Sequence, residues 1–210
     1  MTLVKICGIT NWPDAKLAVD LGAQFLGFNF YRKSPRHIEP QSARRIAAKL
    51  PKDVAAAGVF VNERADVMDS VGYQVKLDFL QLHGEEPPRL VTELAPAYGI
   101  IKAFRVRPGF RVTALSRYSD AAAFLLDGFD AKKRGGTGRG FDWSKAESAK
   151  RFGFVFLAGG LTAENVGAAI RAARPYAVDV ASGVESSPGK KDPARMRAFF
   201  RAVEAAGPNR

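Results

Sequence analysis

Short runs of apolar residues recur along the whole chain, separated by segments with helical spacing or turn residues. Eight runs can be recognised, at residues 4–7, 25–30, 55–61, 77–82, 100–104, 122–126, 154–158 and 177–181. Near-continuous apolar runs of this length are typical of parallel strands that are covered on their outer face. Eight strands that alternate with helices in about 200 residues predict a single-domain α/β fold, the (β/α)8 TIM barrel. An open, doubly wound sheet is the alternative, but it usually has fewer strands.

The segments between the runs carry signals for helices. Thr10 or Asn11 can cap a first helix, with Pro13 in its opening turn and Gly22 after its end. Two later helices are expected after Thr162 and from about Asp192, with buried faces at helical spacing formed by Val166, Ala169, Ile170 and Ala173 and by Met196, Phe199, Phe200 and Val203.

Composition and charge narrow the classes of function. Apolar residues make up 47% of the 210 residues and charged residues 25%, so we expect residues 1–210 to form one globular domain. The 32 basic and 21 acidic residues give a formal net charge of +11, which makes nucleic-acid binding a hypothesis to weigh. The basic residues are spread along the chain, without a basic helix interleaved with aromatic residues. Attraction of an anionic small-molecule substrate is therefore the preferred interpretation.

The sequence also predicts a compartment. Its apolar runs are too short to cross a bilayer, and the N-terminus is strand-like rather than signal-like. The one cysteine cannot form an internal disulfide, which fits a reducing compartment. We therefore expect a cytoplasmic protein that binds neither a membrane nor nucleic acid.

Two reactive side chains lie where apolar runs end. Cys7 ends the first run, and Asp127 directly follows the sixth. In barrel enzymes the C-terminal ends of the strands carry the active site. A thiol and a carboxyl that face one another there indicate proton transfer by a base and an acid. Both residues have structural alternatives, because a lone cysteine is often a small buried hydrophobe and Asp127 can cap a turn with Gly128.

The surroundings of both groups predict their ionisation. Lys5 lies two residues before Cys7 and hence on the same strand face. A nearby cation is expected to lower the pKa of the thiol from its usual value of about 8.5. Lys5 would either tune the thiol or, in the preferred interpretation, pair with a partner inside the barrel. The apolar strand before Asp127 is expected to raise the pKa of its carboxyl by desolvation.

Two glycine-rich turns follow the last two apolar runs. One holds Gly159 and Gly160 before a helix start, and the other holds Ser182 and Gly183. Glycine lets the backbone approach a ligand, and loops after strands seven and eight form the usual phosphate site of this architecture. We therefore expect a phosphate site there, with plain turns as the alternative. The loop at residues 135–138 is a third flexible segment, either a lid over the ligand or an ordinary connection.

Other polar residues have candidate roles. The guanidinium of Arg36 can hold a carboxylate through two hydrogen bonds, or it can be a solvated loop residue. His83 is interpreted as a hydrogen-bonded strand-end residue rather than a catalyst, and we include it among the candidate substrate-binding residues. The chain has only two histidines, both distant from any acidic cluster, so no metal site is expected.

Several motifs in order along nearly the full chain resemble the phosphoribosylanthranilate isomerase family of tryptophan biosynthesis. They are KICGIT (5–10), GFNFY (27–31) with KSPRH (33–37), GVFVN (58–62), QLHG (81–84), LD (126–127), GGTG (135–138) with FDW (141–143), AGGL (158–161) and DVASGVE (179–185). Each motif is weak alone, but together, in this order and spacing, they are highly specific. Two departures are visible: Ala181 stands where a serine is often found, and Gly140 where a bulkier residue is common.

The resemblance implies a role for each matching residue. The catalytic base falls on Cys7, the general acid on Asp127, and the arginine that holds the anthranilate carboxylate on Arg36. Asp179 would contact the sugar or organise the site. The phosphate contacts would fall on Gly159, Gly160, Ser182 and Gly183, with Gly136 and Gly138 nearby.

The implied reaction is an Amadori rearrangement of N-(5-phosphoribosyl)anthranilate to 1-(2-carboxyphenylamino)-1-deoxyribulose 5-phosphate. Both of its chemical steps are proton transfers, so no cofactor is expected. The partner is a small anionic substrate, and the protein is expected to be a monomer or a homodimer. The alternatives are a histidine-pathway sugar isomerase, an isomerase that uses both substrates, and a non-catalytic barrel that binds phosphate or nucleic acid.

Overall fold

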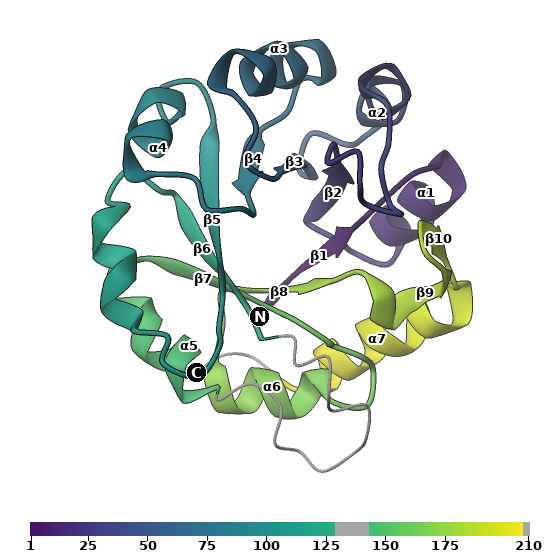
Figure 1. Cartoon of the computed structure of the whole chain (residues 1–210). Coiled ribbons are helices and arrows are strands. Elements are labelled where there is room, and N and C mark those ends of the chain that lie inside the picture. Colours follow the sequence, from purple (N-terminus) through teal and green to yellow (C-terminus); the bar gives the residue numbers. More distant parts are fainter. Residues whose placement is uncertain (129–142, 208–210) are drawn as a thin grey trace.

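Eight parallel strands of the described residues, 1–128 and 143–207, close into a barrel in the computed structural model. Neighbouring strands pair in chain order, and β8 pairs with β1 to complete the ring (Figure 1). The strands are β1 (Leu3–Cys7), β2 (Phe25–Asn29), β3 (Ala55–Phe60), β4 (Phe79–Leu82), β5 (Gly99–Arg105), β6 (Ala123–Asp127), β7 (Phe154–Ala158) and β8 (Ala177–Val180). The predicted TIM barrel is confirmed.

Helices surround the strands on the outside of the barrel (Figure 1). They are α1 (Trp12–Asp20), α2 (Pro40–Ala47), α3 (Ala65–Val75), α4 (Pro88–Leu94), α5 (Ser144–Ala149), α6 (Val166–Ala173) and α7 (Pro193–Ala205), with the 3-10 helices η1 (Val112–Arg117), η2 (Lys150–Phe152) and η3 (Ser182–Val184). None of the helices in the described part of the chain is long and apolar enough to span a bilayer.

Local signals explain where the first and last helices begin. Asn11 caps α1, because its side-chain Oδ1 accepts a hydrogen bond of 2.9 Å from the backbone N–H of Asp14. Asp192 caps α7 by accepting from the N–H groups of Ala194 and Arg195 at 2.8 and 3.0 Å. The capping alternative at Asn11 and the helix start near Asp192 are thus confirmed.

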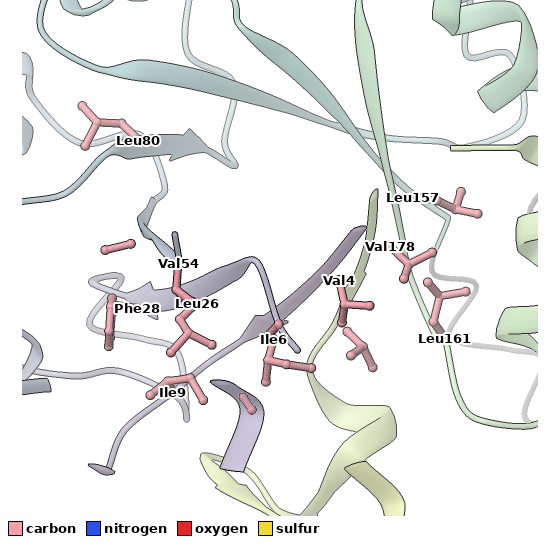
Figure 2. Packing of buried hydrophobic residues seen from close by; sticks show 14 of the residues in the cluster. Val4, Ile6, Ile9, Leu26, Phe28, Val54, Leu80, Leu157, Leu161 and Val178 are labelled. Atoms are coloured by element: carbon pink, nitrogen blue, oxygen red, sulfur yellow. The ribbon is translucent and has the colours of Figure 1, made fainter. Parts of the chain in front are cut away.

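Alternating side chains along the strands create two apolar layers. Phe25, Leu125 and Phe156 belong to a cluster inside the barrel. Their neighbours point outward into the larger cluster between strands and helices, where Figure 2 shows Leu26 and Leu157. Because side chains alternate with a period of two, the inward positions of a strand are fixed once one is known. This alternation turns Lys5 and Cys7, and likewise Asp127, to the inside.

Three features differ from the sequence expectations or extend them. The fourth strand begins at Phe79 rather than Leu77, because Lys76, which caps the end of α3, adopts a left-handed conformation and the N–H of Leu77 donates back to Gly72. Between β5 and β6 the only helix is the 3-10 helix η1, within a connection that is wholly described. After β8 the chain forms a small antiparallel hairpin of β9 (Glu185–Ser187) and β10 (Lys190–Lys191), which the apolar pattern did not predict.

Candidate active site

Cys7 shares the interior of the barrel with a buried ion pair. The Nζ atom of Lys5 donates to Oδ1 of Asp179 on β8 at 2.8 Å, and the Lys5 side chain is fully buried. The expected partner of Lys5 inside the barrel is therefore found. Gly27 faces this group from β2, where an added Cβ would lie 2.9 Å from the Cys7 Sγ and 3.0 Å from the Lys5 Nζ. A glycine here leaves room for both side chains.

Burial controls the ionisation of the thiol. Desolvation raises the pKa of Cys7 above its ordinary value, and this outweighs the lowering by the cations Lys5 and Lys191. The expectation of a lowered thiol pKa is therefore wrong. The main physical reason is the burial of the thiol, and Asp179 adds to it because it neutralises Lys5 and itself acts to raise the pKa of Cys7. Burial acts to lower the pKa of Lys5, but its attraction to Asp179 and Cys7 raises it overall.

The carboxyl of Asp127 contacts His83, at the end of β4. Its Oδ2 lies 3.3 Å from the Nε2 of His83, whose Nδ1 lies 2.8 Å from the Nε2 of Gln81. With the amide nitrogen of Gln81 facing His83, Gln81 donates to Nδ1 of the imidazole. The imidazole proton is then on Nε2 and points to Asp127. Both the Asp127 and His83 side chains are about one-fifth exposed, at 23% and 21%. The expected strand-end role of His83 thus includes a contact with the candidate acid.

The two glycine-rich turns pack against each other. Gly159 and Gly160 adopt φ values of 94° and 64°, a region that favours glycine. At Gly183 an added Cβ would lie 1.9 Å from the carbonyl oxygen of Leu161, so the two loops touch backbone to backbone. A cavity of about 480 Å³ lies against both loops, and it is lined by Gly160, Leu161, Thr162, Ala163, Glu164, Ser182, Gly183, Arg195 and Ala198. The geometry suits a phosphate group.

Arg36 lies beside β1 and makes a two-pronged contact with Glu185. Its Nε donates to both carboxylate oxygens of Glu185 at 2.9 and 3.1 Å, and its Nη2 donates to one of them at 2.7 Å. Gly8 permits this approach, because an added Cβ would lie only 2.6 Å from the Cδ of Arg36. The structure thus gives Arg36 a carboxylate partner from the chain itself, which the sequence did not predict.

Glu185 also contacts Lys191, and both side chains are buried. Burial acts to raise the pKa of Glu185, but hydrogen bonds from Arg36 and the charge of Lys191 hold it below its ordinary value. Burial lowers the pKa of Lys191 despite the attraction of Glu185. The sequence assigned no role to these two residues, nor to Gln81 and Arg195. The signal was weak, since Glu185 was only the last residue of a glycine-containing motif and Lys191 only one of many basic residues.

Two of the residues expected to contact the phosphate lie outside the described residues. Gly136 and Gly138, expected near the phosphate, fall within residues 129–142, outside the described residues, as does Gly140. Within the described ranges, no three side chains of histidine, cysteine, aspartate or glutamate are grouped as a metal site would need.

Comparisons with known proteins match this barrel throughout its length. The sequence matches the profile of the N-(5'-phosphoribosyl)anthranilate (PRA) isomerase family over residues 4–202. N-(5'-phosphoribosyl)anthranilate isomerase of Geobacter metallireducens is 46% identical over 205 residues, covering 98% of this chain and 100% of the relative. The enzyme of Moorella thermoacetica is 48% identical over 207 residues, covering 98% and 91%.

Solved structures of the same family are also similar to this chain. The crystal structure of phosphoribosyl anthranilate isomerase from Thermotoga maritima superposes with a TM-score of 0.89 at 43% identity, covering 98% of this chain and 100% of that one. A structure of phosphoribosyl anthranilate isomerase in complex with reduced 1-(o-carboxyphenylamino)-1-deoxyribulose 5-phosphate gives a TM-score of 0.87 at 42% identity and the same coverage. The chain therefore belongs to the N-(5'-phosphoribosyl)anthranilate isomerase family and converts phosphoribosylanthranilate to 1-(2-carboxyphenylamino)-1-deoxyribulose 5-phosphate in tryptophan biosynthesis.

Proposed function

We propose that Cys7 is the base and Asp127 the acid of this isomerisation. The observation that carries the proposal is their position: each is the last residue of a barrel strand, and strand alternation turns both inward at the same, C-terminal end of the barrel. A substrate seated in that mouth can meet both groups at once. Side chains at this end supply the chemistry in barrel enzymes generally.

The reaction divides into two proton transfers. Asp127, in its protonated form, gives a proton to the ribose ring oxygen as the bond from C1 to that oxygen breaks, and the lone pair of the anthranilate nitrogen forms an iminium. The thiolate of Cys7 then removes the proton from C2, and the electron pair of that C–H bond forms the C1=C2 bond of an enolamine as the π pair of the C1=N bond returns to nitrogen. Tautomerisation of the enolamine gives the ketone. His83 and Gln81 would keep the Asp127 carboxyl in one orientation.

The two anionic ends of the substrate would be held at separate places. Arg36 lies near β1 and would receive the anthranilate carboxylate. Gly159, Gly160, Ser182 and Gly183 would surround the phosphate. A relative that binds a reduced product analogue with the same two anionic groups supports such a division. Asp179 would organise the site by neutralising Lys5 next to the base.

Loss of either proton-transfer group should abolish most of the activity. General acid and general base catalysis each contribute roughly 10²- to 10⁴-fold. We expect Asp127→Asn and Cys7→Ser to lower kcat by factors in this range, measured as the loss of anthranilate-type fluorescence with freshly made phosphoribosylanthranilate. The matched control is Asp20→Asn, an exposed aspartate paired with Lys16 on α1, which should react like wild type. A kcat near that of wild type in Asp127→Asn would move the acid to another residue.

We further propose a cytoplasmic protein that is a monomer or a homodimer. The one cysteine fits a reducing compartment. The enzyme of Thermotoga maritima is described as dimeric and has been converted to monomers, so this barrel is compatible with both states. Sedimentation velocity across a range of protein concentrations distinguishes the two.

A further inference from the structure

We propose that Glu185 and Lys191 are a buried positioning pair. Glu185 orients the Arg36 guanidinium so that one of its edges faces the substrate carboxylate, and Lys191 links Glu185 to the backbone of Cys7. Neither residue belongs to the acid–base pair or to the phosphate loops. The proposal rests on the proposed role of Arg36. It makes Glu185 a determinant of substrate recognition rather than a general support of the fold.

The hydrogen bonds of Arg36 leave a second edge of the guanidinium available. A guanidinium has five N–H groups in one plane, arranged so that two different edges can each face a carboxylate. Glu185 occupies the edge formed by Nε and Nη2. The opposite edge, formed by Nη1 and the second hydrogen of Nη2, makes no hydrogen bond to the described residues. The side chain of Arg36 is 23% exposed, so that edge can meet a ligand.

Glu185 is placed to fix this orientation. Its carboxylate is only 4% exposed, and it accepts from Arg36, from Lys191 at 2.9 Å and from the N–H of Gly189 at 3.3 Å. A buried carboxylate with so many donors has little freedom to rotate. The guanidinium that it holds through three contacts is therefore fixed in plane and in direction.

Lys191 connects the Arg36 site to the catalytic strand. Its fully buried Nζ donates to the carbonyl of Cys7 at 2.5 Å, to Glu185 at 2.9 Å and to the carbonyl of Ala181 at 3.4 Å. It thus contacts the ends of β1 and β8 together.

The hairpin of β9 and β10 accounts for the pairing. Lys191 is directly opposite Glu185 in its antiparallel register, so the turn after β8 brings the two charges together. The Lys191 backbone N–H also donates to Asp14 of α1 at 2.8 Å, which fixes the hairpin against the barrel. The hairpin therefore sets the distance between the carboxylate-binding edge and the base.

The test compares two ligands that differ in one group. The probes are reduced 1-(2-carboxyphenylamino)-1-deoxyribulose 5-phosphate and its phenylamino counterpart without the carboxylate, with Kd measured by titration calorimetry. In wild type the carboxylate should improve binding about 10- to 100-fold, as expected for hydrogen bonds to a charged group. Glu185→Gln should reduce this ratio at least fivefold and should raise KM more than it lowers kcat. Glu204→Gln, an exposed glutamate of α7, is the matched control and should keep the ratio.

Each outcome separates this inference from the role of Arg36 itself. If Arg36→Met keeps the wild-type ratio, the proposed carboxylate site is wrong. If Arg36→Met loses the ratio while Glu185→Gln retains it, the positioning role is overturned. It is also overturned if Glu185→Gln weakens both ligands equally, since that indicates a structural role. Should Glu185→Gln fail to fold, Glu185→Asp takes its place: a reduced ratio supports the proposal, and an unchanged ratio overturns it.

Discussion

At the scale of single residues, the thiol of Cys7 lies among charges that act on its pKa in opposite directions. Burial raises that pKa, the cations Lys5 and Lys191 lower it, and Asp179 raises it. A thiolate with a raised pKa is a stronger base toward a C–H bond, but less of it is present at neutral pH. The site therefore favours basicity of the thiolate over its abundance.

This arrangement predicts the pH dependence of the enzyme. Because the base must lose its proton, kcat/KM should rise with pH through a limb above the ordinary thiol pKa of about 8.5. Asp179→Asn removes a cause that raises the pKa, so its limb should lie at lower pH than that of wild type. Lys5→Met removes a cause that lowers the pKa, so its limb should move to higher pH.

The measurement is kcat/KM against pH for wild type and both variants, with circular dichroism at each pH to confirm the fold. The position of the limb is compared, not the height of the profile, since either substitution can also weaken substrate binding. Shifts of the two variants in the same direction would contradict this account of Cys7.

At the scale of elements, the loops after β7 and β8 depend on the absence of a side chain at Gly183. An added Cβ would lie 1.9 Å from the carbonyl of Leu161, which is backbone and cannot move aside like a flexible side chain. The loops would have to separate, and the cavity that both loops line would change shape.

Two glycine-to-alanine substitutions are expected to change the stability of the protein in opposite directions. Gly183→Ala should destabilise the protein by about 1–3 kcal/mol through overpacking and should raise KM, because the proposed phosphate site is displaced. Gly167→Ala in α6 is the control: its added Cβ would lie 3.3 Å from the flexible end of the Arg171 side chain and 3.6 Å, an ordinary van der Waals distance, from the carbonyl oxygen of Ala202. It should stabilise the helix by roughly 0.5–1 kcal/mol. Urea unfolding and steady-state kinetics check both, and a wild-type KM in Gly183→Ala would contradict the phosphate assignment.

The elements also show what a sequence pattern can predict. The eight strands begin and end within two residues of the apolar runs, because residues buried on both faces need a continuous apolar segment. The hairpin of β9 and β10 has no such pattern, since it contains serines, lysines and a glutamate. Its pairing of Glu185 with Lys191, like that of Arg36 with Glu185, joins positions whose contact only the closed barrel creates. Candidate residues at strand ends could be predicted, but their partners could not.

At the scale of the whole molecule, the protein carries a large positive charge and its substrate is an anion. The chain carries a formal net charge of +11, while the substrate carries a phosphate and a carboxylate. Attraction between them acts over the Debye length, which is about 30 Å at 0.01 M ionic strength and about 8 Å at 0.15 M. At low salt the whole protein can therefore steer the substrate, whereas at higher salt only nearby charges act.

We therefore expect kcat/KM to fall several-fold as sodium chloride raises the ionic strength from about 0.01 to 0.15 M, with kcat changing much less. The reason is that screening weakens encounter and binding, whereas the proton transfers occur inside the barrel. Kinetics in sucrose of equal osmolality are the control, because sucrose leaves the charges unscreened. Sodium chloride is used rather than sulfate, which would compete for the phosphate site. A kcat/KM independent of salt would mean that the positive charge has no part in substrate capture.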